Sequence, residues 1–356
     1  MPTADTAPNS GFKSAPGFTP GLARDAALPA VSVVVPTCGR IDLLGRCLAA
    51  LLGQDLDPRR YDIIVVDDQP DSRTRALVTH LNAGAAAAAA TVPAPAITYL
   101  ANHGVHGPAA ARNLGWRGAR APIVAFTDDD TVPSPGWLRN GLAAFDDSVD
   151  ALCGRVEMPL PASPTDYERD AQQLETAEFV TANCFCRKSV LDALGGFDER
   201  FRLAWREDSD LHFRLLAMGA RIAQAPQALV VHPVRPAPWG VSLLQVRKIA
   251  FDALLYKKHP GLYRQKIRAT ARWDYYAIVG ALLLAVFAAA AGYPALAAAG
   301  AIAWCVPTLL LTARRLRGTT LRASHVAEMA LTSALIPPLA VFWRVVGAIR
   351  FRVAFT

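Results

Sequence analysis

The chain has 356 residues, enough for one large domain or two modest ones. Its apolar fraction of 52% and mean hydropathy of +0.22 are high for a purely soluble protein, and the excess lies mostly beyond residue 277, so a soluble part precedes a membrane part. The net charge of +7 comes without a clustered basic and aromatic motif, which argues against a nucleic-acid partner and favours an anionic membrane surface.

Neither the cysteines nor the N-terminus mark a secreted protein. The six cysteines lack the spacing of a disulfide framework or a zinc site, so we expect free, buried thiols in a reducing compartment. Residues 1–29 are rich in Pro, Gly, Ala and Ser and lack the apolar core of a signal peptide, which predicts a disordered tail. The soluble part is therefore expected to stay in the cytoplasm.

Short apolar runs alternate with helical patterns in the first half of the soluble part. This alternation predicts a doubly wound α/β sheet, in which ligands bind at the carboxyl ends of the strands. The alanine-rich residues 85–90 are expected in a surface loop or a frayed helix end. The expected strands are residues 31–35, 63–66, 97–100 and 123–126, and the expected helices lie near residues 41–51, 73–81 and 108–119.

The second half of the soluble part is more mixed. Helices are expected over residues 168–178, 188–194 and 208–218. Residues 179–185 are a candidate strand, and residues 229–231 are a last short strand that ends at His232.

The triplet Asp128-Asp129-Asp130 directly follows an apolar strand. In successive residues past a strand, the first and third carboxylates face the same way. Two hard oxygen ligands suit Mg²⁺ or Mn²⁺, with water and a diphosphate completing the coordination. The simpler alternative is an acidic turn, which the position after an apolar strand disfavours.

Two further acidic pairs stand at element boundaries. Asp67-Asp68 ends the second strand, where a carboxylate can accept hydrogen bonds from a base or a ribose hydroxyl, or can simply be solvated. Glu207-Asp208 opens a helix, whose dipole keeps a carboxylate ionised. An ionised carboxylate is what a general base requires, although plain N-capping gives the same pattern.

Basic and imidazole side chains near these acids are weaker candidates. His232 follows a strand and suits a metal or a diphosphate, and Arg235 suits phosphate; a surface histidine beside prolines is the alternative. Arg112-Asn113, early in a helix, either touches the nucleotide or caps and solvates the helix.

Taken together, these motifs resemble the family 2 glycosyltransferases, inverting enzymes of the GT-A fold. The resemblance spans about 180 residues, from Val31 to Leu211, and keeps the motifs in family order. The segments that carry it are Val33-Val34-Val35-Pro36-Thr37, Val65-Val66-Asp67-Asp68, residues 107–113, Phe126-Thr127-Asp128-Asp129-Asp130, residues 195–199 and Glu207-Asp208.

The resemblance implies a role for each motif. Pro36 and Thr37 would line the nucleotide site and Asp68 would hold the base. Asp128 and Asp130 would act on the metal and the diphosphate, and Asp208 would be the catalytic base with Glu207 beside it. The candidate residues are thus Asp208 and Glu207 for catalysis, Pro36, Thr37, Asp67, Asp68, Arg112, Asn113, Asp128 and Asp129 for the nucleotide-sugar, and Asp128, Asp130 and His232 for Mg²⁺ or Mn²⁺.

The expected reaction is transfer of one sugar, with inversion, from a nucleotide-diphosphate sugar to a hydroxyl acceptor that is lipid-linked or a cell-envelope polysaccharide precursor. Gln245-Val246-Arg247-Lys248 only partly matches the Gln-x-x-Arg-Trp motif of processive synthases. Gln69-Pro70 replaces the commoner Gly-Ser after the acidic pair, which changes the base-binding loop. A non-catalytic nucleotide-sugar-binding membrane protein is the alternative; a sugar-nucleotidyl transferase fits poorly, since residues 36–39 do not form the glycine-rich basic loop it needs.

The end of the chain predicts a membrane region over residues 275–356, after a GT-A domain at 30–240 and a basic interfacial linker at 241–274. Residues 275–292 span about 27 Å as a helix, and residues 294–313 form a second such stretch. Basic residues flank this hairpin on both outer sides, which places both ends and the catalytic domain on the cytoplasmic side of an inner membrane. Residues 326–349 contain Pro337-Pro338 and Arg344, and are expected to be re-entrant, interfacial or spanning.

Overall fold

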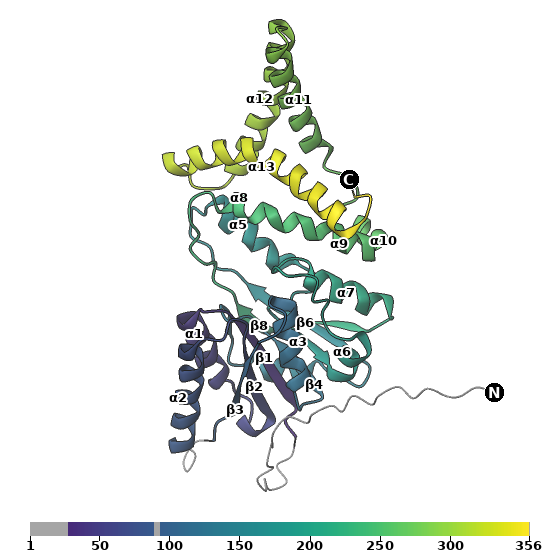
Figure 1. Cartoon of the computed structure of the whole chain (residues 1–356). Helices are drawn as coiled ribbons and strands as arrows, with labels where there is room; N and C mark the ends of the chain where they lie inside the picture. Colours follow the sequence, from purple (N-terminus) through teal and green to yellow (C-terminus); the bar gives the residue numbers. More distant parts are fainter. Residues whose placement is uncertain (1–27, 89–92, 356) are drawn as a thin grey trace, which may run out of the picture.

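The computed structural model describes residues 28–88 and 93–355 (Figure 1). The predicted disordered tail lies outside the described residues apart from its last two positions, and so does the end of the alanine run. A sheet with helices on both faces forms one end of the molecule, and a helical hairpin projects from the other. The predicted mixed α/β sheet followed by apolar helices is confirmed.

Eight strands form one sheet in the order β3-β2-β1-β4-β7-β6-β8-β5. The first four pair in parallel, and β7 pairs antiparallel with both β4 and β6. The strands are β1 Val31–Thr37, β2 Tyr61–Asp67, β3 Ala96–Ala101, β4 Ile123–Phe126, β5 Val132–Pro133, β6 Ala151–Glu157, β7 Cys184–Arg187 and β8 Ile222–Val231.

Side chains of β1 alternate between two apolar cores. Val33 and Val35 pack with α1, α2 and α4, whereas Val34 packs with α3, α6 and α7. Gly115 allows the helix α3 to lie very close to the sheet. A Cβ at this position would come within 2.3 Å of Val34 Cγ1. These helices are α1 Ile41–Leu52, α2 Ser72–Ala88, α3 Pro108–Gly118, α4 Trp137–Ala143, α6 Lys188–Leu194 and α7 Glu207–Ala217.

The structure corrects the sequence prediction in the second half of the sheet. The predicted strand at residues 179–185 begins only at Cys184, because Asn183 N–H bonds to the Val180 carbonyl in a turn. β6 was not anticipated, since Cys153 and Gly154 interrupt its apolar pattern. β8 is longer than expected and carries a register irregularity beside Gly154.

Short helices separate the sheet from the hairpin. They are α5 Asp166–Gln172, α8 Val241–Gln245, α9 Ala250–Lys258 and α10 Pro260–Leu262, joined by the 3₁₀ turns η2 Gln173–Thr176 and η3 Val246–Ile249 and the π-helical η4 Tyr263–Ile267; a further 3₁₀ turn, η1 Pro58–Arg60, precedes β2. Aromatic residues of α7, α9 and η4 form a third core that also takes in Phe355 near the end of the chain. The predicted basic linker is therefore a packed layer of helices.

Three helices of the described chain are long and apolar enough to cross a membrane: α11 Trp273–Ala290, α12 Pro294–Leu316 and α13 Ala323–Phe351. α11 and α12 form the projecting hairpin, and α13 runs across its foot beside α8 and α9 (Figure 1). Near the start of α13, Glu328 accepts a hydrogen bond from Gly240 N–H at 2.6 Å. Near its end, Lys257 of α9 donates to the Phe351 carbonyl at 2.7 Å, so α13 is bonded at one end to the segment after β8 and at the other to the helical layer.

Candidate active site

Three potential metal ligands meet at the carboxyl ends of the central strands. Asp128 and Asp130 follow β4, and His232 follows β8. These strands are not neighbours, but the two-residue β5 pairs Val132 with Val231 and so carries the acidic triplet to His232. One donor atom from each of the three residues lies within 4.8 Å of the others, the one such group among the described residues.

The donor set suits a small divalent cation. Two carboxylate oxygens and an imidazole nitrogen within 4.8 Å of one another could together hold Mg²⁺ or Mn²⁺. The His232 Nδ1 atom is buried and has no hydrogen-bond partner in the described part of the chain, and its Nε2 lies 3.6 Å from Asp130 Oδ1. A buried imidazole nitrogen left unpaired is consistent with a site that a ligand completes.

The middle residue of the triplet points the other way. The Asp129 side chain is fully buried, accepts a hydrogen bond from Thr37 Oγ1 at 2.7 Å, and pairs with Arg40 Nη2 at 2.6 Å. Burial raises the pKa of Asp129 to about 6, against the opposing effect of Arg40. Asp129 and Thr37 thus tie the end of β1 to the triplet. Arg40 was not anticipated, and the only signal for it is its place just past a strand that ends at the site.

Arg112 connects the triplet to the predicted catalytic pair. Its side chain is 3% exposed, and its guanidinium donates to Asp128 at 2.7 Å and to Glu207 at 3.1 Å. Although burial opposes its charge, Asp128 and Glu207 hold the pKa of Arg112 above its usual value. Burial would also raise the pKa of Asp128, but Arg112 and His232 outweigh it, and the pKa lies below its usual value.

Glu207 and Asp208 occupy different environments. Glu207 is buried, and burial together with the neighbouring charge of Asp208 raises its pKa to about 7. Asp208 is half-buried and accepts from Ser209 N–H at 2.6 Å, while no side chain caps the helix at Arg206. α7 therefore starts one residue earlier than predicted, and plain N-capping does not account for the acidic pair.

The other predicted nucleotide residues line the neighbouring strand ends. Pro36 is buried within β1 and pairs with Val66. Asp67 is buried and accepts from Asp71 N–H and the Tyr99 hydroxyl, which shapes the loop after β2. Asp68 is partly exposed and accepts from Asn102 and from Gly107 N–H. Their contacts with a nucleotide remain predictions.

Asn113 lies apart from the acidic group. Its amide donates to the Phe197 carbonyl and to Glu199, and its oxygen accepts from Phe197 N–H and Trp116 Nε1. The amide is saturated by these bonds, which leaves it no free group for a nucleotide. Gly196, at φ +73°, lies against this side chain, since a Cβ there would be 2.3 Å from Asn113 Oδ1. Asn113 thus shapes the loop before α7, a different role from the predicted nucleotide contact.

Three further residues near the site were missed by the sequence reasoning. Lys248 in η3 lies with its amine 5.9 Å from the centre of the Trp205 ring. Burial, helped by the charges of Arg235 and Arg247, lowers the pKa of Lys248 below its usual value against the opposing effect of Glu207. Trp205 Nε1 and Arg206 Nε both donate to Asp252 of α9, so the loop before Glu207 is fastened to the helical layer. The partial Gln-x-x-Arg-Trp match containing Lys248 was the available signal.

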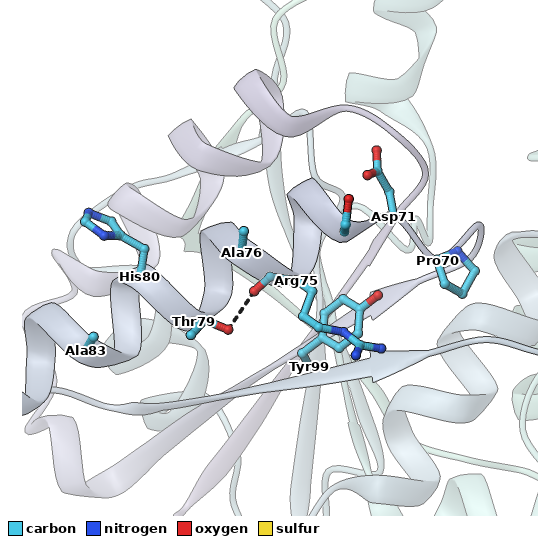
Figure 2. Close-up of a pocket in the computed structure, with 9 residues that line it drawn as sticks. Pro70, Asp71, Arg75, Ala76, Thr79, His80, Ala83 and Tyr99 are labelled. Carbon is cyan, nitrogen blue, oxygen red and sulfur yellow. Dashed lines mark hydrogen bonds between the residues drawn. The ribbon is translucent and has the colours of Figure 1, made fainter.

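A hollow of about 620 Å³ lies beside α2, outside the acidic group (Figure 2). The Arg75 guanidinium lies 5.2 Å from the centre of the Tyr99 ring there, and Thr79 Oγ1 donates to the Arg75 carbonyl. The hollow borders the predicted base-binding loop through Pro70 and Asp71 but contains none of the candidate metal or catalytic residues. We assign it no role in the chemistry.

The sequence profile of Glycosyl transferase family group 2 matches residues 123–345, and that of Glycosyl transferase family 2 matches residues 32–195. The chain therefore belongs to the family 2 group of glycosyltransferases, and the predicted family is confirmed.

Characterised relatives agree with this assignment. Glycosyltransferase AglE of Haloferax volcanii is 26% identical over 223 residues, which cover 59% of this chain and 69% of the relative. The pre-mycofactocin glycosyltransferase of Mycobacterium tuberculosis is 37% identical over 145 residues, which cover 36% of this chain but 30% of the relative. The mannosyltransferase PcManGT of Pyrobaculum calidifontis, solved with GDP-Man and Mn²⁺, covers 91% of this chain and 89% of its own at 20% identity and a TM-score of 0.55, which confirms the GT-A fold.

Replacing Glu207 with Gln should change how stability depends on pH. The pKa of about 7 in the folded protein lies above the ordinary carboxyl value of 4.5, so ionisation between these values disfavours the folded state. The thermal unfolding midpoint of the wild type, relative to Glu207→Gln, should therefore fall as the pH rises from about 4.5 to 7 and then level off. The measurement is thermal unfolding in detergent with EDTA. Parallel curves for the two proteins would show that Glu207 is not held protonated.

Proposed function

We propose that this chain is a metal-dependent, inverting glycosyltransferase that transfers a single sugar from a nucleotide-diphosphate sugar to a hydroxyl acceptor at the membrane. One observation carries the proposal: the group Asp128, Asp130 and His232 is joined through buried Arg112 to the acidic pair at the start of α7. This contact supports a proposed metal-diphosphate site and a proposed proton acceptor held at a fixed separation.

The donor is proposed to lie along the carboxyl ends of β1, β2 and β4. Pro36, Thr37 and the partly exposed Asp68 would face the nucleoside. Asp128, Asp130 and His232 would hold Mg²⁺ or Mn²⁺, and such an ion offsets negative charge that develops on a departing diphosphate. Arg235, whose Nε lies 2.9 Å from Asp130 Oδ2, borders this metal group.

Asp208 is proposed as the general base and Glu207 as the group that positions it. The two carboxylates are adjacent, but Glu207 is committed to Arg112 while Asp208 is half-exposed and bonded only to Ser209 among the described residues. Neighbouring carboxylates in unlike environments divide acid and base roles at many active sites. The base would take the proton of the acceptor hydroxyl as its oxygen attacks the anomeric carbon from the face opposite the diphosphate.

Membrane placement follows from the helices. We propose that α11 and α12 span the bilayer and that α13 lies at its inner surface. Exposed apolar side chains cover the hairpin, Phe287 and Ile302 among them. α13 is instead held at both ends by the catalytic part, and a Cβ at Gly347 would come within 2.4 Å of the Ala250 carbonyl oxygen. Buried Arg344 packs over the Phe355 ring at 4.6 Å, away from lipid. Basic flanks favour the cytoplasmic face of an inner membrane.

Asp130→Ala should abolish most donor turnover. Losing one carboxylate weakens the ion and diphosphate site, and we expect nucleotide-sugar hydrolysis with Mn²⁺ to fall by about 10²-fold or more. The assay screens the purified full-length protein against a panel of nucleotide-sugars, with and without EDTA. The control is Asp147→Ala, which removes an exposed carboxylate elsewhere in the same domain. Full activity of the wild type in EDTA would contradict metal dependence.

Asp208→Asn should separate binding from chemistry. Asn has nearly the same shape as Asp but accepts no proton at neutral pH, so donor affinity should be unchanged while transfer falls by about 10²-fold or more. Donor affinity is measured by calorimetry with Mn²⁺, and transfer by product formation. Normal turnover by the variant would assign the base to another group.

Cysteine labelling should place one loop outside and two segments inside. The background replaces Cys38 and Cys305, the exposed cysteines of the described chain, by Ser and Ala. In intact cells an impermeant reagent should label Tyr293→Cys, between α11 and α12. It should not label Leu321→Cys, before α13, or Ala354→Cys, after it, until the cells are opened. Labelling of Ala354→Cys from outside would show that α13 spans the bilayer, and labelling of Leu321→Cys from outside would invert the whole topology.

A further inference from the structure

A second cavity lies where the catalytic part meets the membrane helices. It measures about 350 Å³, and its walls come from the start of α5, the segment 235–242 and the facing ends of α12 and α13. Arg235 lines this cavity and also contacts Asp130 of the candidate metal group at 2.9 Å. One side chain therefore belongs both to the cavity and to the proposed donor site.

The acidic residues in the cavity wall are already engaged. Asp166 accepts two hydrogen bonds from Arg315, at 3.1 and 2.7 Å. Glu168 completes the capping box of α5 with Thr165, and Glu328 accepts from Gly240 N–H. Asp166 is thus paired with a cation, and the carboxylates of Glu168 and Glu328 accept hydrogen bonds from donors of the fold.

Two of the cavity's cations keep unused donors. The exposed Arg322 side chain has no hydrogen bond or ion pair with any described residue, while its carbonyl accepts from His325 and Val326 N–H. Arg322 immediately precedes the 29-residue α13, so it lies beside the positive end of that helix dipole. The Arg235 side chain is 47% exposed and pairs with Asp130 through Nε, and its two terminal nitrogens make no hydrogen bond with any residue in the described part of the chain. Free guanidinium groups in a cavity favour an anion with several oxygens, for which their planar donor arrangement is suited.

The cavity also faces the lipid side of the molecule. Trp239 lines it with a ring that is 53% exposed, and its Nε1 donates to the Ser324 carbonyl at the start of α13. A tryptophan with a fixed N–H and an exposed ring is typical of the boundary between lipid and water. An anionic head group anchored in the bilayer would enter here without leaving its membrane.

We infer that this cavity binds the phosphate of a lipid-linked acceptor, with Arg322 and Arg235 as its ligands. The inference rests on the proposed function and identifies its acceptor class. The sugar-accepting hydroxyl of such a molecule would lie beyond Arg235, on the side of Asp130 and the donor. Arg235 would then contact both the acceptor's phosphate and Asp130 of the metal group, whereas Arg322 would contact the acceptor alone.

The test measures binding of a fluorescent dodecyl phosphate to the full-length protein in phosphatidylcholine nanodiscs, whose neutral lipid removes general attraction of basic proteins. Wild type should bind it saturably, and Arg322→Gln should weaken binding about tenfold, the usual effect of losing one charge-assisted hydrogen bond. Arg322→Lys should restore part of the affinity. Nucleotide-sugar binding with Mn²⁺ should be unchanged in both variants, because Arg322 makes no contact with the described donor site.

The matched control is Arg317→Gln, which removes an exposed positive charge from the same end of the hairpin without altering the cavity wall. It should leave binding unchanged, and the same tail ending in a hydroxyl should bind weakly to all variants. An equal loss in Arg317→Gln, or equal binding of the uncharged probe, would overturn the inference.

Two competitors separate the remaining sources of phosphate. Displacement of the probe by a nucleoside diphosphate with Mn²⁺ would assign the cavity to the donor, and displacement by added phosphatidylglycerol would make it a general site for membrane lipid. Either result overturns the acceptor assignment. Because probe binding requires neither donor nor metal, this failure would leave the proposed function to be decided by the donor assay.

Discussion

The buried ion group around Arg112 is the constraint on which the candidate site depends. One guanidinium, with 3% of its side chain exposed, pairs with Asp128 after β4 and with Glu207 at the start of α7. Removing one partner of a buried ion pair costs about 3–5 kcal/mol, since the remaining charge is left in a low dielectric. The strand end that bears the candidate metal ligands and the helix that bears the proposed base are therefore held as one unit. The proposed transfer would need such a fixed separation between donor and acceptor.

A second connection runs from this unit to the membrane. Trp205 and Arg206, just before Glu207, are bonded to Asp252 of α9. α9 in turn packs against α13, where Gly347 allows the two backbones to approach closely. The proposed base is thus separated from the membrane-proximal helix by a short series of direct contacts. If the acceptor is held in the bilayer, as proposed, this arrangement would fix the catalytic end of the sheet at a defined height above it.

The family and the main acidic residues could be predicted from the sequence because each rests on local chemistry. Apolar runs that end in Asp67-Asp68 and Asp128-Asp129-Asp130 give parallel strands with acids at their carboxyl ends, whatever packs around them. The hairpin could be predicted in the same way, since an uncharged stretch as long as a bilayer is a property of composition. Contacts between distant segments left no comparable signal: the pair Arg40–Asp129 joins positions 89 residues apart, and the two-residue β5 is too short to produce a periodic pattern.

The sequence by itself determined the order of strands and helices along residues 31–126, the acidic strand ends and the presence of membrane-length helices, because these depend on the pattern of neighbouring residues. Only the tertiary structure decided which carboxylates of those clusters are free. In the folded chain, Asp129 points inward and pairs with Arg40, and Asn113 bonds to the loop before α7. His232, at the end of a distant strand, lies beside Asp128 and Asp130. The tertiary structure also decided that α13 returns to the catalytic part at both ends. The physical reason is that the burial and pairing of a side chain depend on partners far apart in the chain, which a local sequence pattern cannot indicate.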